Sequence, residues 1–234
     1  MIGSAREDRG ARAAAAVLLL LVIGAIAPAR AGAPFPDPRR FEGDIAAFEA
    51  ADRECFPPEG ALLCIGSSSM RMWHPTLAAD LAPATVIPRG FGGSTMLDAL
   101  FFAGRIVLPY RPSAILLYEG DNDIALGVPP EKVFAAFDSF VSLVRASLPG
   151  TKIHVISVKP SPSRREFLPE TIRVNRLLRE ACDADTLLAF IDVASPMLNE
   201  KGEPIEELFL EDMLHMNEKG YAVWREVVRK AIYE

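Results

Sequence analysis

Short apolar runs alternate with helix-like stretches along most of this 234-residue chain, and this alternation restricts its fold more than any other feature. The runs are apolar at successive positions, which is typical of strands that are buried on both faces. The pattern therefore predicts an α/β fold with a parallel five-stranded sheet covered by helices. The expected strands are residues 61–66, 84–88, 113–118, 152–158 and 187–192, and the expected helices are residues 41–53, 94–107, 129–147, 168–183 and 218–233.

The last of these helices has clear boundaries in the sequence. Asn217 is a typical N-cap residue, and Glu218 places a negative charge at the positive end of the helix dipole. Tyr221, Trp224 and Val228 belong to one apolar stripe that would pack on the core. The residues just before Asn217 are therefore expected in a loop that a docked helix holds in place.

The first 31 residues are predicted to be a secretory signal peptide and not part of the fold. Three arginines precede an apolar run over residues 13–27, and the small-x-small sequence Ala29-Arg30-Ala31 follows it. The run is short for a transmembrane helix, although an uncleaved N-terminal anchor remains the alternative. We expect a secreted or periplasmic protein with no stable membrane insertion after cleavage. Residues 32–40 contain three prolines and predict an extended linker, followed by one domain over residues 41–234.

Charge and cysteine content limit the classes of partner. The formal net charge of −6 argues against nucleic acid or an anionic membrane as the main partner. Of the three cysteines, Cys64 and Cys182 are expected to fill core space, and a Cys55–Cys64 bridge is possible. No Cys/His cluster predicts a metal site, and no P-loop or dinucleotide glycine motif predicts a cofactor. The oligomeric state is not indicated by the sequence.

Four polar segments are candidates for one hydrolytic site. Ser68 follows the first expected strand, Gly93 the second and Asn122 the third, and the fourth segment places Asp212 three residues before His215. The carboxyl ends of parallel strands meet at one edge of a sheet, so the first three should converge there. The loop that carries Asp212 and His215 would have to reach the same edge.

These residue types match the needs of acyl transfer through a covalent intermediate. A serine hydroxyl needs a base, which His215 would supply while Asp212 orients the ring. The oxyanion needs preorganised N–H donors, which the backbone of Ser68, the backbone of Gly93 and the side-chain amide of Asn122 would supply. Each residue alone also has an ordinary explanation, as a helix cap, a turn or a loop residue. Their order at the ends of successive strands favours the catalytic interpretation.

Other polar and aromatic residues are weaker candidates. His154 lies inside an expected strand and is interpreted as a core or edge residue, and His74 as structural. Asp123 is expected to brace the loop after the third strand. Arg71 and Trp73 stand near Ser68 in the sequence, and we expect them to shape the pocket.

The chain resembles the SGNH hydrolases, also called the GDSL esterase/lipase family. The family's serine, glycine, asparagine and histidine blocks correspond to Ile65-Gly66-Ser67-Ser68-Ser69-Met70, Arg89-Gly90-Phe91-Gly92-Gly93-Ser94-Thr95, Gly120-Asp121-Asn122-Asp123 and Asp212-Met213-Leu214-His215. The resemblance covers about residues 41–234. It implies a flavodoxin-like three-layer α/β/α sandwich and substrates among short-chain carboxylic esters, lysolipids or acetylated sugars.

One position departs from the family pattern. The family's first block usually reads Gly-Asp-Ser, whereas this chain has Ser67 in place of the aspartate. By register Ser68 is the nucleophile, with Ser67 and Ser69 as alternatives. The family's aspartate is generally structural, so activity is expected to survive its replacement.

The leading hypothesis is an exported serine esterase, a carboxylic ester hydrolase that forms an acyl-enzyme on Ser68 with His215 as base and Asp212 as its orienter. It would need no metal and no cofactor, and its partner would be a small-molecule or glycan ester. One alternative is a carbohydrate O-deacetylase acting on acetylated polysaccharide. Another is a non-catalytic binding module of the same fold.

Overall fold

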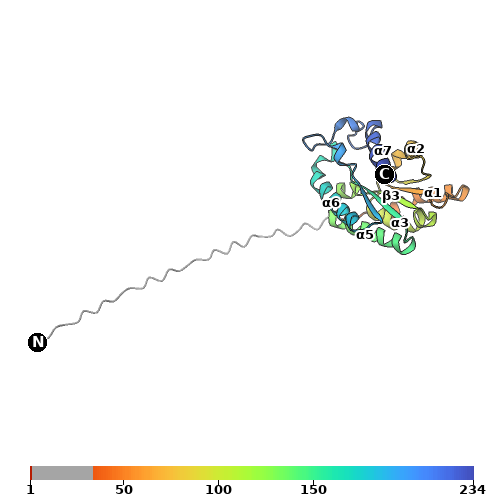
Figure 1. Ribbon diagram of the computed structural model, residues 1–234, viewed down its shortest axis with the longest axis horizontal. Coiled ribbons are helices and arrows are strands. Elements are labelled where there is room, and N and C mark those ends of the chain that lie inside the picture. Colours follow the sequence, from red (N-terminus) through yellow and green to blue (C-terminus); the bar gives the residue numbers. More distant parts are fainter. Residues whose placement is uncertain (2–33) are drawn as a thin grey trace. The chain divides into compact units, whose positions relative to one another are not determined.

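The computed structural model describes Met1 and residues 34–234, and residues 34–234 contain a five-stranded parallel sheet with helices on both faces (Figure 1). The strand order is β2-β1-β3-β4-β5, and every neighbouring pair is parallel. The predicted sheet and its five strands are confirmed. The strands are β1 (Leu62–Gly66), β2 (Val86–Gly90), β3 (Ala114–Tyr118), β4 (Lys152–Ile156) and β5 (Leu188–Ile191).

Successive strand residues face opposite layers of helices. Leu63 and Ile65 pack in a core cluster with residues of α1, α3, α5 and α6, whereas Leu62 and Cys64 pack in a second cluster with α2 and α7. Figure 1 shows α2 and α7 on one side of the sheet and α3 and α5 on the other. The three-layer α/β/α sandwich is therefore confirmed. The helices are α1 (Glu42–Glu54), α2 (Ser68–Asp80), α3 (Met96–Ile106), α4 (Asp121–Ala125), α5 (Pro130–Ser147), α6 (Leu168–Ala184) and α7 (Glu218–Tyr233).

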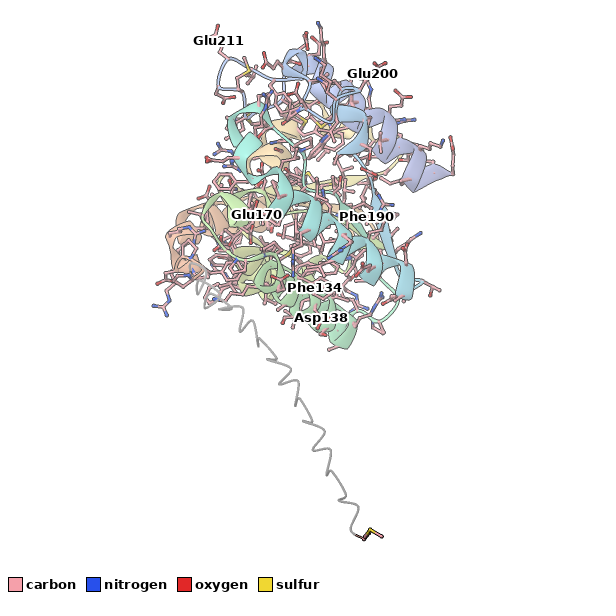
Figure 2. The ribbon with its side chains drawn as sticks, turned by 90° about the vertical axis from the view of Figure 1, so that its left-hand side faces the viewer. Phe134, Asp138, Glu170, Phe190, Glu200 and Glu211 are labelled. Atoms are coloured by element: carbon pink, nitrogen blue, oxygen red, sulfur yellow. The ribbon has the colours of Figure 1, made fainter. Side chains whose placement is uncertain are left out.

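Helix α5 illustrates how an outer helix packs one face on the core and exposes the other to solvent. Phe134 packs against the core cluster, whereas Asp138, one turn further along, is exposed (Figure 2). Val133, Phe137 and Phe140 complete the buried stripe. No helix of the described residues is long and apolar enough to cross a membrane.

Two helical segments differ from expectation. Helix α2 begins at Ser68, directly after β1, and was not predicted because Pro75 stands in its interior and a proline usually ends a helix. The expected linker over residues 32–40 is not extended throughout, because a 3-10 helix, η1 (Pro38–Phe41), begins inside it. The side chain of Asp37 accepts the Arg39 N–H at the start of η1, and a proline fits a first helical position.

The N-terminal predictions fall mostly outside the described residues. The predicted signal peptide over residues 1–31 lies there apart from Met1, as do residues 32 and 33 of the predicted linker. The linker and the domain that follows it are continuous within the described part, where Phe35 already packs against the core.

The cysteines are unpaired, so the possible Cys55–Cys64 bridge is not formed. Cys64 faces the α2/α7 layer from the inner strand β1, whereas Cys55 follows α1 in the opposite layer, so the sheet separates the two thiols. Cys64 and Cys182 are buried, as expected for core residues, and burial raises the pKa of both thiols.

Candidate active site

The site lies where the order of the strands reverses. After β1 the chain moves to β2 on one side, and it then returns to β3 on the other side of β1, which makes a topological switch point. Gly66 ends β1 against Tyr118, the last residue of β3, and a Cβ on Gly66 would stand 2.2 Å from the Tyr118 carbonyl oxygen. Only glycine fits this close approach, which carries the chain directly from β1 into α2.

A continuous hydrogen-bond chain joins three of the predicted residues. The Nε2 atom of His215 lies 3.0 Å from Ser68 Oγ, and its Nδ1 atom lies 2.6 Å from Asp212 Oδ2. The 3.0 Å distance is normal for a hydrogen bond, and the 2.6 Å distance is short, in the direction expected for a bond to a carboxylate. The loop before α7 therefore does reach the strand edge that carries Ser68, although 147 residues separate the serine from the histidine.

Asp212 is held as a carboxylate. Burial acts to raise its pKa, but hydrogen bonds from the His215 ring and from the backbone N–H groups of His215 and Leu214 lower the pKa to about 2. An anion beside Nδ1 fixes the ring with Nε2 toward Ser68 and stabilises the imidazolium form.

Ser68 is the most accessible of the three consecutive serines. Ser67 and Ser69 are only 1% and 2% exposed, whereas Ser68 is partly exposed. The carbonyl of Ser69 accepts the Tyr221 hydroxyl, and the N–H of Ser67 donates to the Tyr118 carbonyl. The alignment of the family's serine block points to Ser68. In the structure Ser68 is also the accessible serine, and its hydroxyl lies beside His215.

The backbone of two of the predicted site residues has features that suit an N–H donor. Ser68 is the first residue of α2, so its backbone N–H has no partner within the helix and lies at the positive end of the helix dipole. Gly93 is exposed and has φ +88°, a conformation that favours glycine. These are the groups expected to donate to an oxyanion.

The Asn122 side chain ties the loop after β3 to the loop after β2. Its Nδ2 donates to the Ser94 carbonyl (2.9 Å), while its Oδ1 accepts from Arg164 (3.0 Å). Two more contacts join the same loops, because Ser94 Oγ donates to Glu119 and Asp123 accepts the Met96 N–H. Burial raises the pKa of Glu119 well above its usual range, which favours the protonated form of that carboxyl. The expectation that Asp123 braces its loop is confirmed.

The remaining candidates take structural positions. The expectation that Trp73 shapes the pocket is wrong, because the side chain is fully buried and donates to Asp80. Arg71 is exposed, and its guanidinium packs against Gly92. His74 accepts the Gly90 N–H, and burial lowers its pKa to about 4, so it is a neutral structural residue.

His154 is also not part of the site. It is buried in β4, where it contributes to the core, and burial lowers its pKa to about 4. Its Nδ1 atom has no hydrogen-bond partner within the described part of the chain.

Sequence reasoning missed a charged group beneath Asn122. Lys159 and Arg164 both contact the carboxylate of Asp121, although all three belong to loops or helix starts that commonly face solvent. The available signal was position, because Lys159 follows β4 by three residues and therefore lies at the same edge of the sheet as Ser68. Within residues 34–234, no group of three or more His, Cys, Asp or Glu side chains is arranged to hold a metal ion.

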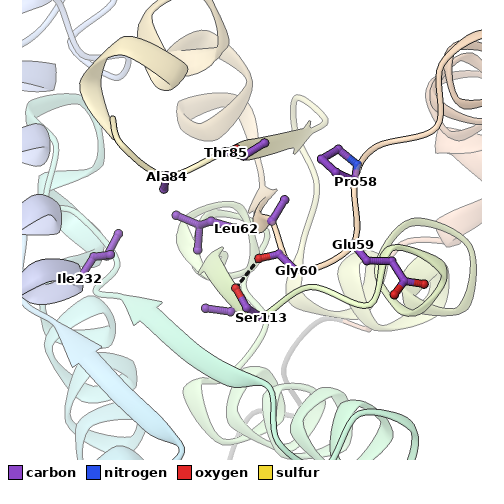
Figure 3. Close-up of a pocket in the computed structure, with 10 residues that line it drawn as sticks. Pro58, Glu59, Gly60, Leu62, Ala84, Thr85, Ser113 and Ile232 are labelled. Atoms are coloured by element: carbon purple, nitrogen blue, oxygen red, sulfur yellow. Dashed lines mark hydrogen bonds between the residues drawn. The ribbon is translucent and has the colours of Figure 1, made fainter.

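A separate cavity of about 330 Å³ lies at the opposite edge of the sheet (Figure 3). Leu62 and Ala114, the first residues of β1 and β3, line it, together with Ile232 from α7. Ser113 Oγ donates to the Gly60 carbonyl in its wall. The cavity is remote from Ser68, since Ser68 follows the other end of β1.

Residues 59–223 match the model of the GDSL-like Lipase/Acylhydrolase family. The chain belongs to this family. This match confirms the resemblance inferred from the four blocks, and family membership supports an ester hydrolase. No curated protein matches this GDSL-family chain in sequence.

Solved structures share the fold of this GDSL-family chain. A protein from Streptococcus pneumonia, described as a platelet activating factor, is 20% identical to this chain and has a TM-score of 0.72. The match covers 83% of this chain and 94% of that protein. A GDSL-like lipase from Bacteroides thetaiotaomicron is 22% identical with a TM-score of 0.65, covering 84% and 97%. An acetylxylan esterase from Geobacillus stearothermophilus, solved as a catalytic mutant, is 14% identical with a TM-score of 0.61, covering 76% and 95%.

Proposed function

We propose that this GDSL-family protein is a serine esterase that hydrolyses carboxylic esters through an acyl-enzyme on Ser68. The observation that carries the proposal is the hydrogen-bond chain from Asp212 through His215 to the accessible Ser68 hydroxyl. A non-catalytic binding module of this fold would have no need of such an aligned chain.

The proposed reaction has two halves. In the first, Nε2 of His215 takes the proton from Ser68 Oγ as that oxygen attacks the ester carbonyl carbon, and the imidazolium then protonates the departing alcohol. In the second, water attacks the acyl carbon, His215 takes its proton, and the carboxylic acid leaves as Ser68 regains its hydrogen. Asp212 remains anionic throughout and stabilises the imidazolium in both halves.

The negative oxygen of each tetrahedral intermediate needs hydrogen-bond donors. We assign this role to the backbone N–H groups of Ser68 and Gly93 and to Nδ2 of Asn122. Ser68 lies at the start of α2, and Asn122 follows β3 beside it, so donors come from both sides of the switch point. Loss of one such donor typically lowers the rate by roughly 100- to 1,000-fold.

The test is hydrolysis of p-nitrophenyl acetate and butyrate by the purified protein and by Ser68→Ala. We expect wild-type turnover and loss of nearly all of it in Ser68→Ala. Ser67→Ala is the matched control, because Ser67 is the neighbouring serine and makes no side-chain capping bond to α2. Wild-type turnover in Ser68→Ala would refute the nucleophile assignment.

Covalent labelling separates the esterase from a binding module. A fluorophosphonate probe should add one phosphonyl group to Ser68 of the wild-type protein, which mass spectrometry of the labelled peptide would locate. Ser68→Ala should not be labelled. An unlabelled, folded wild-type protein without ester turnover would favour the binding module.

The second candidate is an O-deacetylase that acts on acetylated polysaccharide. The acetylxylan esterase noted above shares the fold of this chain but only 14% of its sequence, so it supplies a substrate to test. Acetate release from acetylated xylan, compared with release of fatty acid from lysolipids and of p-nitrophenol from acyl esters, would assign the alcohol class. Turnover of acyl esters with no acetate release from xylan would exclude that polysaccharide.

We also propose that the protein is exported, on the basis of the predicted signal peptide over residues 1–31. Expression of the full chain in a Gram-negative host should give a mature N-terminus at Gly32 in the periplasm or medium, read by mass spectrometry. Intact protein in the membrane fraction would instead indicate an uncleaved anchor, and intact protein in the cytoplasm would refute export.

A further inference from the structure

The Asn122 side chain can be oriented without ambiguity from its two partners. A guanidinium only donates hydrogen bonds, so Arg164 must face the amide oxygen. A backbone carbonyl only accepts, so the Ser94 carbonyl must face the amide nitrogen. This arrangement uses one N–H of Nδ2, and the second N–H has no acceptor among residues 34–234. Asn122 therefore retains one donor for a ligand oxygen.

Arg164 is itself held by a buried charge cluster. Asp121 accepts from Lys159 Nζ (3.0 Å) and forms an ion pair with Arg164. The Lys159 side chain is fully buried, and that of Arg164 is 19% exposed. Two cations and one anion leave a net charge of +1 next to Asn122. A positive charge in a partly buried site stabilises negative charge that develops nearby more strongly than it would in water.

The same segment also contacts the loop that carries His215. Ser163, next to Arg164 in the 3-10 helix η3 (Pro162–Phe167), donates its backbone N–H to the Met213 carbonyl at 3.0 Å. Residues 163 and 164 thus join the asparagine block to the histidine block. The position of Arg164 is therefore determined by both loops that would surround a substrate.

We propose that Arg164 is a positioning residue for the esterase reaction: its guanidinium fixes the Asn122 amide with the free N–H available to the oxyanion. Because the donor to Oδ1 is a cation, it also polarises the amide and makes the Nδ2 hydrogens stronger donors. Arg164 acts through Asn122 and not by contact with the reacting atoms. The inference rests on the proposed serine esterase function.

A double-mutant cycle tests this coupling. Arg164→Met keeps a long side chain but removes the donor and the charge, and Asp121 keeps Lys159 as a partner, so we expect the variant to fold. In the wild-type background, kcat for p-nitrophenyl butyrate should fall roughly 10- to 100-fold with KM changed less than about 3-fold. In an Asn122→Ala background, the same substitution should change kcat less than about 3-fold.

Two further variants serve as references. Arg165→Met is the matched control. Arg165 is the next residue, its side chain is half exposed, and its ion pair with Glu203 is long, at 3.7 Å. The kcat of this variant should remain within about twofold of wild type. Arg164→Lys keeps the charge without the planar two-pronged donor and should give an intermediate kcat. Circular dichroism and Tm establish folding, and if Arg164→Met does not fold, the cycle with Arg164→Lys decides.

The outcomes separate this inference from the proposed function. If the wild-type protein lacks ester turnover, or if Ser68→Ala keeps it, both proposals are overturned. If the wild-type protein turns over esters through Ser68, but Arg164→Met is near wild type or lowers kcat equally with and without Asn122, only the positioning role is overturned.

Discussion

Asp212 uses its two carboxylate oxygens for two different tasks beside His215. Oδ2 lies 2.6 Å from the ring Nδ1, while Oδ1 accepts the backbone N–H groups of Leu214 and His215 itself. Between them, Met213 takes φ +55°, and the His215 carbonyl accepts the Leu210 N–H to close the loop. One side chain therefore fixes both the loop that carries the histidine and the orientation of its ring.

This division predicts the effect of Asp212→Asn. The asparagine oxygen can keep the backbone contacts, but an N–H₂ group replaces the acceptor for the ring and favours the wrong tautomer. We expect kcat for p-nitrophenyl esters to fall by about 10² to 10⁴ with Tm little changed. Glu211→Gln is the control, because that carboxylate is the exposed neighbour on the same loop (Figure 2). A kcat of Asp212→Asn within threefold of wild type would contradict the orienting role.

The sheet and the places of Ser68 and Asn122 could be predicted from the sequence for a common reason. Buried parallel strands have a strong apolar signal, and residues that follow them must meet at one edge. Helix α2 was missed because Pro75 contradicts its local pattern, whereas packing of Met70 and Leu77 on the sheet stabilises it.

The charged group under the site was missed for a different reason. Lys159, Arg164 and Asp121 are residue types that usually stay in solvent, and single-sequence reasoning has no measure of burial. Their pairing depends on three loops that only the folded sheet brings together. The contact of Arg164 with Asn122 across 42 residues has no local pattern that could reveal it.

The burial of Asp123 leads us to predict that the stability of the protein depends on pH. Burial raises its pKa to about 7, with hydrogen bonds from the Met96 and other backbone N–H groups opposing the shift, and its Oδ2 has no partner among the described residues. An ordinary aspartate titrates near 3.9 in the unfolded chain, so between about pH 4 and 7 the folded state binds the extra proton. Stability attributable to this group is therefore present at low pH and is lost as pH rises toward 7.

The measurement compares wild type with Asp123→Asn. The difference in unfolding free energy, wild type minus variant, should decrease by at most about 1.4 kcal/mol per pH unit from pH 4 to 7 and then remain constant. Both proteins carry Glu119→Gln as well, because burial and also the charge of Asp123 raise the pKa of Glu119, which couples the two carboxyls. A difference that is constant across this range, measured by urea unfolding, would show that Asp123 titrates normally.

The backbone conformation of Gly93 leads us to predict that a side chain at this position lowers kcat. Its φ of +88° is strained for any residue with a Cβ, although only Phe41 lies within 4 Å of a Cβ built there. Gly93→Ala should cost about 1 kcal/mol of stability and change the direction of the N–H that we propose as an oxyanion donor, which lowers kcat by roughly tenfold or more. Gly104→Ala, in the last turn of α3 where a Cβ would have nothing within 4 Å, is the control and should keep kcat. Equal kcat in the two variants would exclude the Gly93 N–H as a donor.

We predict that removal of the buried Lys159 lowers stability more than removal of a surface lysine does. Burial acts to raise the pKa of Asp121, but the charges of Lys159 and Arg164 outweigh it and lower that pKa, so the buried carboxylate is ionised. Lys159→Met removes one of its two cationic partners. Complete loss of a buried partner typically costs 3–5 kcal/mol, and the remaining Arg164 should reduce this to about 2 kcal/mol.

The control for Lys159→Met is Lys152→Met, because Lys152 is exposed at the start of β4, the strand that Lys159 follows. Its effect on the unfolding free energy should be below about 0.5 kcal/mol. Urea unfolding at pH 7 measures both variants. Because Asp121 bears its charge only above its lowered pKa, the loss caused by Lys159→Met should also shrink as the pH falls and the carboxylate gains a proton. A loss as small as that of Lys152→Met would mean that Arg164 alone is sufficient to hold Asp121.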